Sequence, residues 1–328
     1  MPFLKIEDLK TLIIDFTSHC NAMCGNCSRN ISGVEVNPNM PLQHMSLDTW
    51  KKIIDNSEYI DEIIFNGSYG DAMMNPILLE ALEYASSNKI SIMIHTNGGV
   101  GKPELYTKLA TILKNFKQPS GVTWSIDGLE DTNHLYRRGV IWQRIMDNVQ
   151  AFIKAGGLAR WRMLVFEHNA HQVEECERLA FSMGFKKFDI NGGHTFSAMN
   201  SVVGEAIEKF KANKKDEART IAYDKSYLDN VERVKGLLEK GFDKGHITCK
   251  WQKKRKVQIS HMGEVLPCCY LLTDRYPRYP DSPYAVEQKD MKWPNINTES
   301  LKAIVQGETL TYPKDNRFKI CEVTCGEV

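Results

Sequence analysis

The sequence lacks any strong excess of charge, because its 328 residues carry a formal net charge of +1 at pH 7. Chains that bind nucleic acid or an anionic membrane surface are usually far more charged, so we expect neither partner. The sequence also lacks an N-terminal apolar run long enough for a signal peptide or a membrane-spanning helix. We therefore expect a cytoplasmic protein of ordinary globular composition.

An even set of cysteines, typical of disulfide-rich secreted proteins, is also missing. The chain has nine cysteines, and an odd number in a chain of this length favours a reducing compartment. In that setting clustered cysteines usually serve metal or redox chemistry. The cysteines stand at positions 20, 24, 27, 176, 249, 268, 269, 321 and 325. Cys176 falls on the apolar side of an expected helix, which predicts a position in the core.

The first 195 residues alternate short apolar runs with helix-period segments. The runs start about 25 to 50 residues apart, which leaves room for a crossover helix each time, as parallel βα units require. We therefore expect an α/β fold with a partial, TIM-like (β/α)6 barrel, whose chemistry gathers at the C-terminal ends of the strands. The six expected strands are residues 11–16, 62–67, 90–96, 122–127, 163–166 and 186–191.

Two of the intervening helices have clear sequence signals. One covers residues 169–184, with Asn169 placed as its N-cap and Gly184 as its C-terminal stop. The other ends at residues 156–157. Its expected apolar face consists of Ile141, Ile145, Val149 and Phe152.

The alternation ends near residue 195, which predicts a change of organisation. Apolar and polar residues alternate over residues 256–270, with a turn at Met262–Gly263, and this pattern predicts a β-hairpin. Residues 300–307 predict a short helix. The expected divisions are a barrel over residues 1–195, a charged helical insert over residues 196–245 and a small C-terminal domain over residues 246–328.

Cys20, Cys24 and Cys27 directly follow the first expected strand. They therefore lie on the first βα loop, at the end of the barrel where chemistry is expected. Three thiolates hold three irons of a [4Fe–4S] cube and leave the fourth iron open, as a catalytic zinc site leaves one position for the reacting molecule. The alternative is a zinc knuckle completed by His19 or by a remote cysteine.

The spacing of these cysteines, C-x3-C-x2-C, resembles the signature of the radical S-adenosylmethionine (SAM) superfamily. The resemblance implies that SAM chelates the open iron through its amino and carboxylate groups. It also implies that an electron from the cube splits SAM into methionine and a 5'-deoxyadenosyl radical, which abstracts hydrogen from a substrate. The residue before the third cysteine is usually aromatic in the family but is Asn26 here, so the resemblance does not extend to the packing of the adenine.

Segments at the later strand ends resemble the SAM-binding segments of this family. Tyr69-Gly70-Asp71 stands where the family has Gly-Gly-Glu, and a glycine there lets the backbone approach SAM while a carboxylate suits its ammonium group. An ordinary turn is the alternative. The resemblance implies that Thr96, Ser125 and Asp127 contact the ribose or the methionine part of SAM. It also implies that Arg138 or Arg137 pairs with the SAM carboxylate, and that Asn191 of the segment 191–193 borders the adenine.

The C-terminal cysteines resemble the extension called SPASM or its shorter form, twitch, because Cys249, Gly263 and Cys268 fit its opening C-x(9–15)-G-x4-C. Five cysteines instead of the seven of a full SPASM domain imply one auxiliary [4Fe–4S] cluster. Neighbouring strand residues point to opposite faces, so we expect only one of Cys268 and Cys269 to reach it. A zinc site is the alternative. The implied ligands are Cys249, Cys268, Cys321 and Cys325.

These resemblances imply an oxidoreductase-type radical SAM enzyme whose auxiliary cluster accepts an electron. We expect a small-molecule substrate, such as a sugar, because the 19 residues before the first cluster cysteine are too few for a peptide-recognition domain. The alternatives are a maturase of a ribosomally made peptide and a non-catalytic iron–sulfur or zinc protein with a redox or scaffold role. A reducing partner such as flavodoxin or ferredoxin is also implied.

Overall fold

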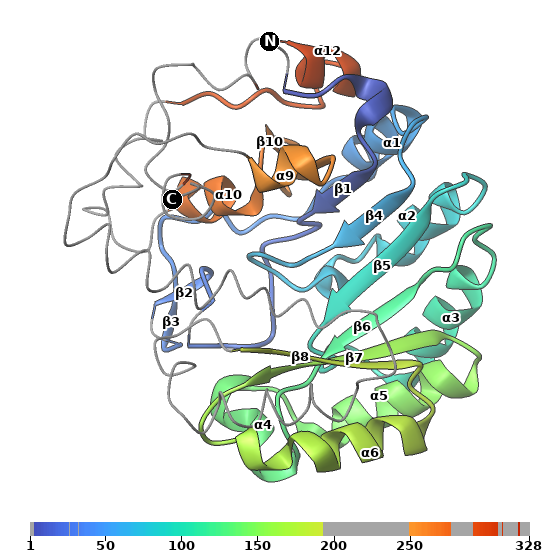
Figure 1. Cartoon of the computed structure of the whole chain (residues 1–328), viewed down its shortest axis with the longest axis vertical. Helices are drawn as coiled ribbons and strands as arrows, with labels where there is room; N and C mark the ends of the chain where they lie inside the picture. The colour runs from blue at the N-terminus through green and yellow to red at the C-terminus, as the bar shows by residue number, and fades with distance from the viewer. Residues whose placement is uncertain are drawn as a thin grey trace.

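The structure is a computed structural model, and Figure 1 draws the whole chain. The expected helical insert at 196–245 and the ligand candidate Cys325 lie outside the described residues. Among the described residues, no helix is both long enough and apolar enough to span a membrane. The structure describes residues 3–25, 27–31, 33–192, 249–276, 291–307, 310 and 321.

Six parallel strands form the body of one sheet in chain order, which confirms the expected partial barrel. Their C-terminal ends all point to the same edge, on the left of Figure 1. We call this edge the rim. The strands are β1 (Thr11–Ile14), β4 (Glu62–Phe65), β5 (Ser91–Thr96), β6 (Gly121–Ser125), β7 (Leu158–Val165) and β8 (Lys187–Gly192).

Strand β7 begins at Leu158, five residues before the start that its apolar run predicts. Arg160 and Arg162 interrupt the apolar run, but the backbone stays extended and alternate residues are buried. A strand with only one face buried shows alternating apolar and polar residues in its sequence, whereas a strand buried on both faces shows a continuous apolar stretch. The run of apolar residues therefore marks only the C-terminal part of this strand.

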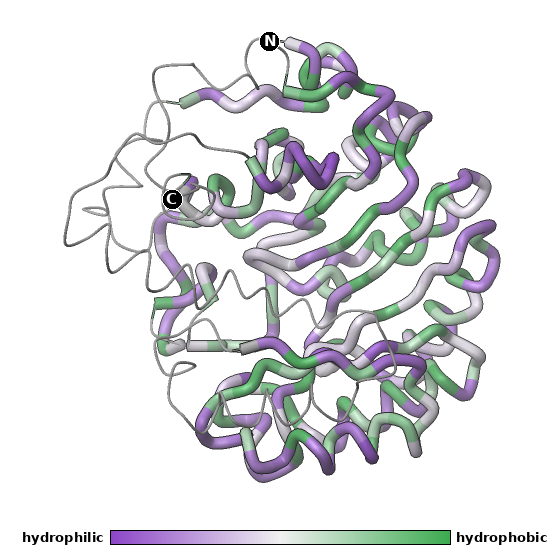
Figure 2. Tube along the Cα trace, in the orientation of Figure 1, coloured by the Kyte–Doolittle hydropathy of each residue, from purple (hydrophilic) through white to green (hydrophobic). Residues whose placement is uncertain are grey.

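Helices cover the outer face of the sheet, away from the rim (Figure 1). Figure 2 shows hydrophobic and hydrophilic residues alternating along α5 and α6, as expected for helices that pack on one side only. The helices are α1 (Leu47–Asp55), α2 (Leu78–Ala85), α3 (Pro103–Leu113), α4 (Glu130–Tyr136), α5 (Trp142–Lys154) and α6 (Val173–Met183).

Two details of these helices differ from the sequence predictions. Helix α5 begins after Ile141, whose backbone is extended and whose side chain is 56% exposed, so this residue is not part of the apolar face. Asn169 does not cap a helix with its side chain, because its Oδ1 accepts from the backbone N–H of Phe166 at 2.7 Å. Gly184 does end α6 in the left-handed region, at φ 97°, as predicted.

The C-terminal part of the chain extends the same sheet beyond β1. Strand β9 (Lys256–Ile259) pairs with β1 in parallel, and β10 (Val265–Leu266) returns antiparallel to β9. The predicted hairpin is therefore present, with Gly263 at φ 83° in its turn. The remaining helices are α9 (Lys250–Lys253), α10 (Cys269–Arg275) and α12 (Leu301–Gln306).

Short elements complete the described residues. They are η1 (Ile6–Asp8), η2 (Ala72–Met74) and η3 (Ala170–Gln172), and the small hairpin β2 (Asn30–Ile31) and β3 (Glu35–Val36).

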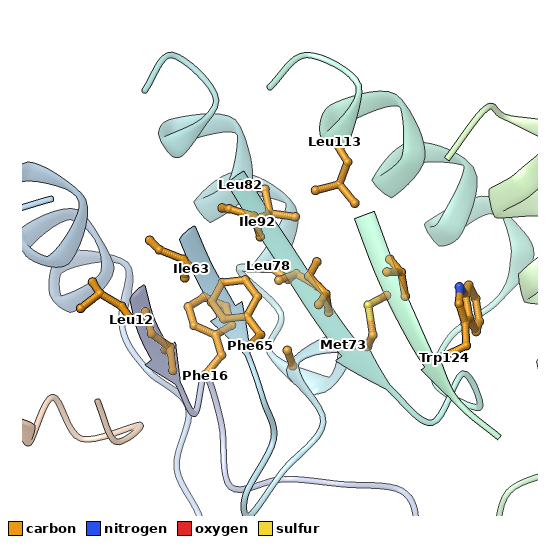
Figure 3. Close-up of a cluster of buried hydrophobic side chains, with 14 of the residues drawn as sticks. Leu12, Phe16, Ile63, Phe65, Met73, Leu78, Leu82, Ile92, Leu113 and Trp124 are labelled. Carbon is orange, nitrogen blue, oxygen red and sulfur yellow. The ribbon is translucent and has the colours of Figure 1, made fainter. Parts of the chain in front are cut away.

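The core lies between the strands and the outer helices. Figure 3 shows Leu12, Ile63 and Ile92 from three neighbouring strands beside Leu82 of α2 and Leu113 of α3. All five side chains are almost fully buried. This packing fixes where each strand ends, and the strand ends fix the loops at the rim.

Trp124 of β6 anchors this core, because it is fully buried and packs on Tyr106 and Phe152 at ring-centroid distances of 5.0 and 5.9 Å. We expect Trp124→Ala to lower the free energy of unfolding by about 3–5 kcal/mol, measured by urea denaturation. Phe181→Ala, at a ring that is 46% exposed on α6, is the control and should change it by less than about 0.5 kcal/mol. Equal midpoints for the two variants would contradict this prediction.

Candidate functional site

The three-cysteine loop follows β1 at the rim. Cys24 is buried, whereas Cys20 and Cys27 are half-buried, and all three are free thiols. The backbone N–H of Cys27 donates to the carbonyl of Cys24 at 3.2 Å, which closes the loop into a tight turn. Three thiols are thus presented from one short segment at the edge where the strands end.

Glycines from neighbouring segments hold the backbone of this loop. A Cβ on Gly70 would lie 2.2 Å from the carbonyl oxygen of Thr17 and 2.7 Å from that of His19. A Cβ on Gly33 would lie 2.9 Å from Gly25 Cα, and Gly33 also has a φ of 71°. Only glycine fits such close backbone contact. By contrast, a Cβ on Gly25 would meet no atom of the described residues within 4 Å apart from its chain neighbours, so no described segment covers the loop on that side.

Two polar residues that the sequence analysis did not single out contact the loop. Asn97 donates through Nδ2 to Asn21 Oδ1 at 2.8 Å and lies 3.6 Å from the Sγ of Cys20. Arg29 is buried, and its Nε donates to the carbonyl of Ser18 at 3.0 Å. Asn97 follows directly after β5, so its position at a strand end is the signal that would have found it.

Asp71 and Thr96, both predicted to contact SAM, are brought together. The Asp71 carboxylate accepts from the Thr96 hydroxyl and from the Asn97 N–H, each at 2.8 Å, and from the Met73 N–H at 3.0 Å. Burial raises the pKa of Asp71, and these donors oppose that rise. The carboxylate therefore fixes the β4 and β5 loops to each other beside the cysteine loop, since the Asp71 N–H also donates to the His19 carbonyl at 2.9 Å.

Burial also shifts the pKa values of the thiols in the cysteine loop. It raises the pKa of Cys20 to about 12, with the nearby Asp71 charge adding to the rise. It raises the pKa of Cys24 to about 11, although the Arg137 guanidinium opposes this shift. Both thiols are therefore protonated at neutral pH without a metal, and a bound metal ion or cluster displaces their protons.

Asp127 lies in a buried ion pair. Its Oδ2 is 2.7 Å from Arg137 Nε, the two side chains are 0% and 13% exposed, and its Oδ1 accepts from the Leu164 N–H at 2.7 Å. Burial alone would lower the pKa of Arg137, but the charges of Asp127 and Cys24 raise it. The Arg137 charge thus acts both on Asp127, after β6, and on Cys24 of the cysteine loop.

The other predicted SAM contacts are distributed around the rim. Arg138 is exposed, and its Nη1 donates to the Gly33 carbonyl at 3.3 Å. Ser125 ends β6 and Asn191 lies near the end of β8, and both are half-buried. The Tyr69 ring is buried and its hydroxyl donates to the carbonyl of Leu272 in α10. Its side chain thereby links the barrel to the C-terminal region.

Asp15 joins β1 to both of its neighbours at the rim. It is fully buried and accepts from Gln258 Nε2 at 2.6 Å and from the Tyr69 N–H at 3.2 Å. Burial raises the pKa of Asp15 to about 6, and the hydrogen bonds that it accepts oppose the rise. One carboxylate therefore bonds to β9 and to the β4 loop at the same time.

A second group of cysteines lies in the C-terminal region. Cys268 and Cys321 are buried and belong to one apolar cluster with Tyr69 and Leu272. Burial raises the pKa of Cys268, and negative charge on the neighbouring thiols of Cys269, Cys321 and Cys249 raises it further. Cys268 and Cys321, two of the four predicted auxiliary ligands, therefore lie in one buried cluster, and the charges of Cys249 and Cys269 act on Cys268.

The expectation about adjacent cysteines rests on a wrong assignment of secondary structure. β10 ends at Leu266, Cys268 is the extended residue before α10, and Cys269 is the first residue of that helix. Strand alternation thus does not apply to this pair, and both thiols interact with each other.

The donor chemistry of both groups fits iron–sulfur clusters. Within the described ranges, no three His, Cys, Asp or Glu side chains converge as a single metal ion requires. A cube makes no such demand, because each thiolate binds a different iron. The first group offers three thiols beside an open backbone at Gly25, and the second offers a larger set, so the first fits a cube with one open iron.

Comparisons with known proteins agree with this chemistry. Residues 14–180, slightly more than half of the chain, match the radical SAM superfamily. The chain belongs to the radical SAM superfamily. Residues 249–326 match SPASM, an iron–sulfur cluster-binding domain. The cofactors of this radical SAM protein are therefore those predicted from its sequence, SAM and two [4Fe–4S] clusters.

A curated relative is the AdoMet-dependent heme synthase of Methanosarcina barkeri (strain Fusaro / DSM 804), which is 25% identical over 175 residues. The match covers 52% of this chain and 46% of the heme synthase, so this radical SAM protein corresponds to less than half of that relative.

Two solved structures share the fold. SuiB of Streptococcus suis bound to S-adenosylmethionine has a TM-score of 0.62 at 14% identity, covering 92% of this chain and 66% of SuiB. The anSMEcpe protein with bound AdoMet has a TM-score of 0.61 at 15% identity, covering 92% of this chain and 78% of anSMEcpe. At these identities the likeness concerns the fold of the radical SAM protein.

The close approach of Gly70 to the cysteine loop gives a test of cluster loading. Because an added Cβ would collide with the Thr17 and His19 carbonyls, we expect Gly70→Ala to displace the loop and lower bound iron from about eight to about four per chain. Iron and sulfide assays after anaerobic reconstitution measure this loss. The iron retained by the C-terminal cysteines is the internal control, and a full complement of iron in the variant would count against the packing described.

The Asp127–Arg137 ion pair gives a second test. Breaking a buried pair leaves one charge uncompensated, so we expect Asp127→Asn and Arg137→Met each to lower the free energy of unfolding by about 3–5 kcal/mol. The double variant should lose less than the sum, as a double-mutant cycle of urea denaturation measures. Asp147→Asn, at an exposed acid of α5, is the control. Additive losses would mean that the two residues act separately.

Proposed function

We propose that this protein cleaves SAM reductively and uses the resulting 5'-deoxyadenosyl radical to abstract hydrogen from a small-molecule substrate, such as a sugar. The observation that carries the proposal is the three-thiol loop at the rim, held by glycine contacts on one side and open at Gly25 on the other. A site of this kind leaves one iron for SAM. When bound, the cluster supplies the electron that splits the sulfonium bond.

The proposed SAM contacts are the eight residues predicted from the sequence. Their positions on several strand ends support the assignment, because active sites in barrels of this type gather residues from several strands at one rim. The bonds of Asp71 and Asp127 add a positioning role, since each carboxylate holds segments beside the cysteine loop. The residues are Tyr69, Gly70, Asp71, Thr96, Ser125, Asp127, Arg138 and Asn191.

We further propose that Cys249, Cys268, Cys321 and Cys325 hold the auxiliary cluster. The position of Cys268 and Cys321 in one buried cluster supports this set, as does the influence of the Cys249 charge on Cys268. A fully ligated cluster has no open iron, so its role here is to accept an electron from the substrate radical. A reduced flavodoxin or ferredoxin is the proposed electron donor to the enzyme.

A peptide substrate is the second candidate. SuiB has been solved bound to the precursor peptide SuiA, and anSMEcpe has been solved with AdoMet and the Cp18Cys peptide. Both share the fold of this chain, with TM-scores of 0.61 and 0.57. The fold therefore accommodates peptides, and substrate screening should include them.

Replacing one thiol of the first group tests the radical chemistry. We expect Cys24→Ala to abolish formation of 5'-deoxyadenosine from SAM, because the cluster loses one of three ligands, while about four irons per chain are retained. Liquid chromatography of the reduced, reconstituted protein with SAM measures the product.

Cys176→Ala is the matched control for this experiment. Cys176 is also a buried free thiol, but it lies on α6 in the outer helical layer, so both iron content and SAM cleavage should equal those of the parent. SAM cleavage by Cys24→Ala at the parent rate would overturn the proposal. One zinc and about four irons per parent chain would keep the radical site and make the C-terminal site structural.

A further inference from the structure

The inner face of the sheet, which none of the described helices covers (Figure 1), is strongly cationic along β7 and β8. Arg160 pairs in register with Lys187, and Arg162 pairs with Asp189. The alternate residues Ala159, Trp161 and Met163 are fully buried. Since neighbouring strand residues point to opposite faces, the two arginines and Lys187 lie on the inner face.

These inner side chains are only half-buried. The same holds for His95 on β5 and Asp189 on β8, so the inner face of these described strands carries ionisable side chains that are only partly covered. A packed barrel interior would instead be filled by branched apolar side chains. The inner face of these strands is therefore polar and charged.

The inner charges do not balance. Asp189 is the one acid on the inner face of described strands β5 to β8, and its Oδ1 lies 2.7 Å from Lys187 Nζ. Neither Arg160 nor Arg162 makes a hydrogen bond to the described residues. Three cations thus face one carboxylate, and that carboxylate is already paired.

The arginines influence each other and His95. Burial and the Arg160 charge lower the pKa of Arg162, and Asp189 opposes this effect. Burial and the charges of Arg162 and Arg160 lower the pKa of His95 to about 3, so this imidazole is neutral at physiological pH. Like charges that are near each other and partly buried repel, and an anion placed between them would relieve the repulsion.

The cationic group adjoins the proposed SAM contacts, with Arg162 level with Ser125 and Arg160 level with Thr123, two residues deeper along the strands. Arg162 is the register partner of Ser125, and Asn191 follows Asp189 by two residues on β8, on the same inner face. A substrate group held by the arginines would therefore sit beside and below Ser125, with the rest of the molecule extending toward the rim. This is the orientation that a substrate needs in order to present a carbon to SAM.

We propose that the substrate carries an oxyanion, a carboxylate or a phosphate, which Arg160 and Arg162 bind inside the barrel. This inference rests on the proposed function, because it assigns the substrate of that same site. Guanidinium groups form paired hydrogen bonds to both kinds of oxyanion, whereas a neutral sugar would leave the two charges uncompensated.

Titration calorimetry of the reconstituted holoprotein, saturated with SAM and at constant ionic strength, tests the proposal with inorganic phosphate and, separately, acetate. We expect one anion to bind per chain. The anion that binds more tightly identifies the substrate group as a phosphate or a carboxylate. Arg160→Met and Arg162→Met should each weaken binding by at least about tenfold, and Arg162→Lys by less, because it keeps the charge but loses the paired geometry.

Arg144→Met removes an exposed arginine of α5 and is the matched control, with anion binding and SAM cleavage like the parent. No binding by the parent at about 20 mM of either anion would overturn the proposal. Undiminished binding by the Arg160 and Arg162 variants would also overturn it, as would competition between phosphate and SAM, which would assign the arginines to the SAM carboxylate. Formation of 5'-deoxyadenosine by the parent, measured alongside, tests the proposed function separately.

Discussion

The rim depends on the parallel hydrogen bonding of β1 on both sides. β4 pairs with one edge of this strand and β9 pairs with the other, so the loop that leaves its C-terminal end is fixed between the barrel and the C-terminal region. Asp15 reinforces this arrangement, because a single buried carboxylate accepts from Gln258 of β9 and from the backbone of Tyr69. The cysteine loop inherits its position from these bonds.

Polar contacts then connect the loop to the remaining strand ends. Asp71 and Asn97 fix the segments after β4 and β5 beside Cys20, and the Asp127–Arg137 pair does the same for the segment after β6 beside Cys24. Each carboxylate is buried and fully engaged with protein groups. Backbone and carboxylate contacts therefore fix the site, and no described segment covers the loop where it passes Gly25.

Features of the fold and of the site can be predicted from the sequence where a local pattern of residues has a single physical explanation. Buried parallel strands read as apolar runs, and three thiols in eight residues mark a metal site, so the six strands and the first cysteine group are predictable. Partnerships between distant residues are not, because nothing local specifies that Asp127 meets Arg137 or that Cys268 precedes a helix. Arg160 and Arg162 are missed for a related reason, since charged residues facing a barrel interior look like an interruption of the strand.

The parallel pairing of β1 with β9 also has a consequence for synthesis of the chain. Asp15 and Gln258, which hydrogen-bond across this pair, are 243 positions apart. Contacts of such separation form late, because the intervening chain must first be made and brought round. Until residues 256–259 emerge, β1 presents an unpaired edge, the kind of surface that templates association with other chains. β1 is thus among the last strands of this sheet to be covered on both edges, and the cluster loop leaves from its end.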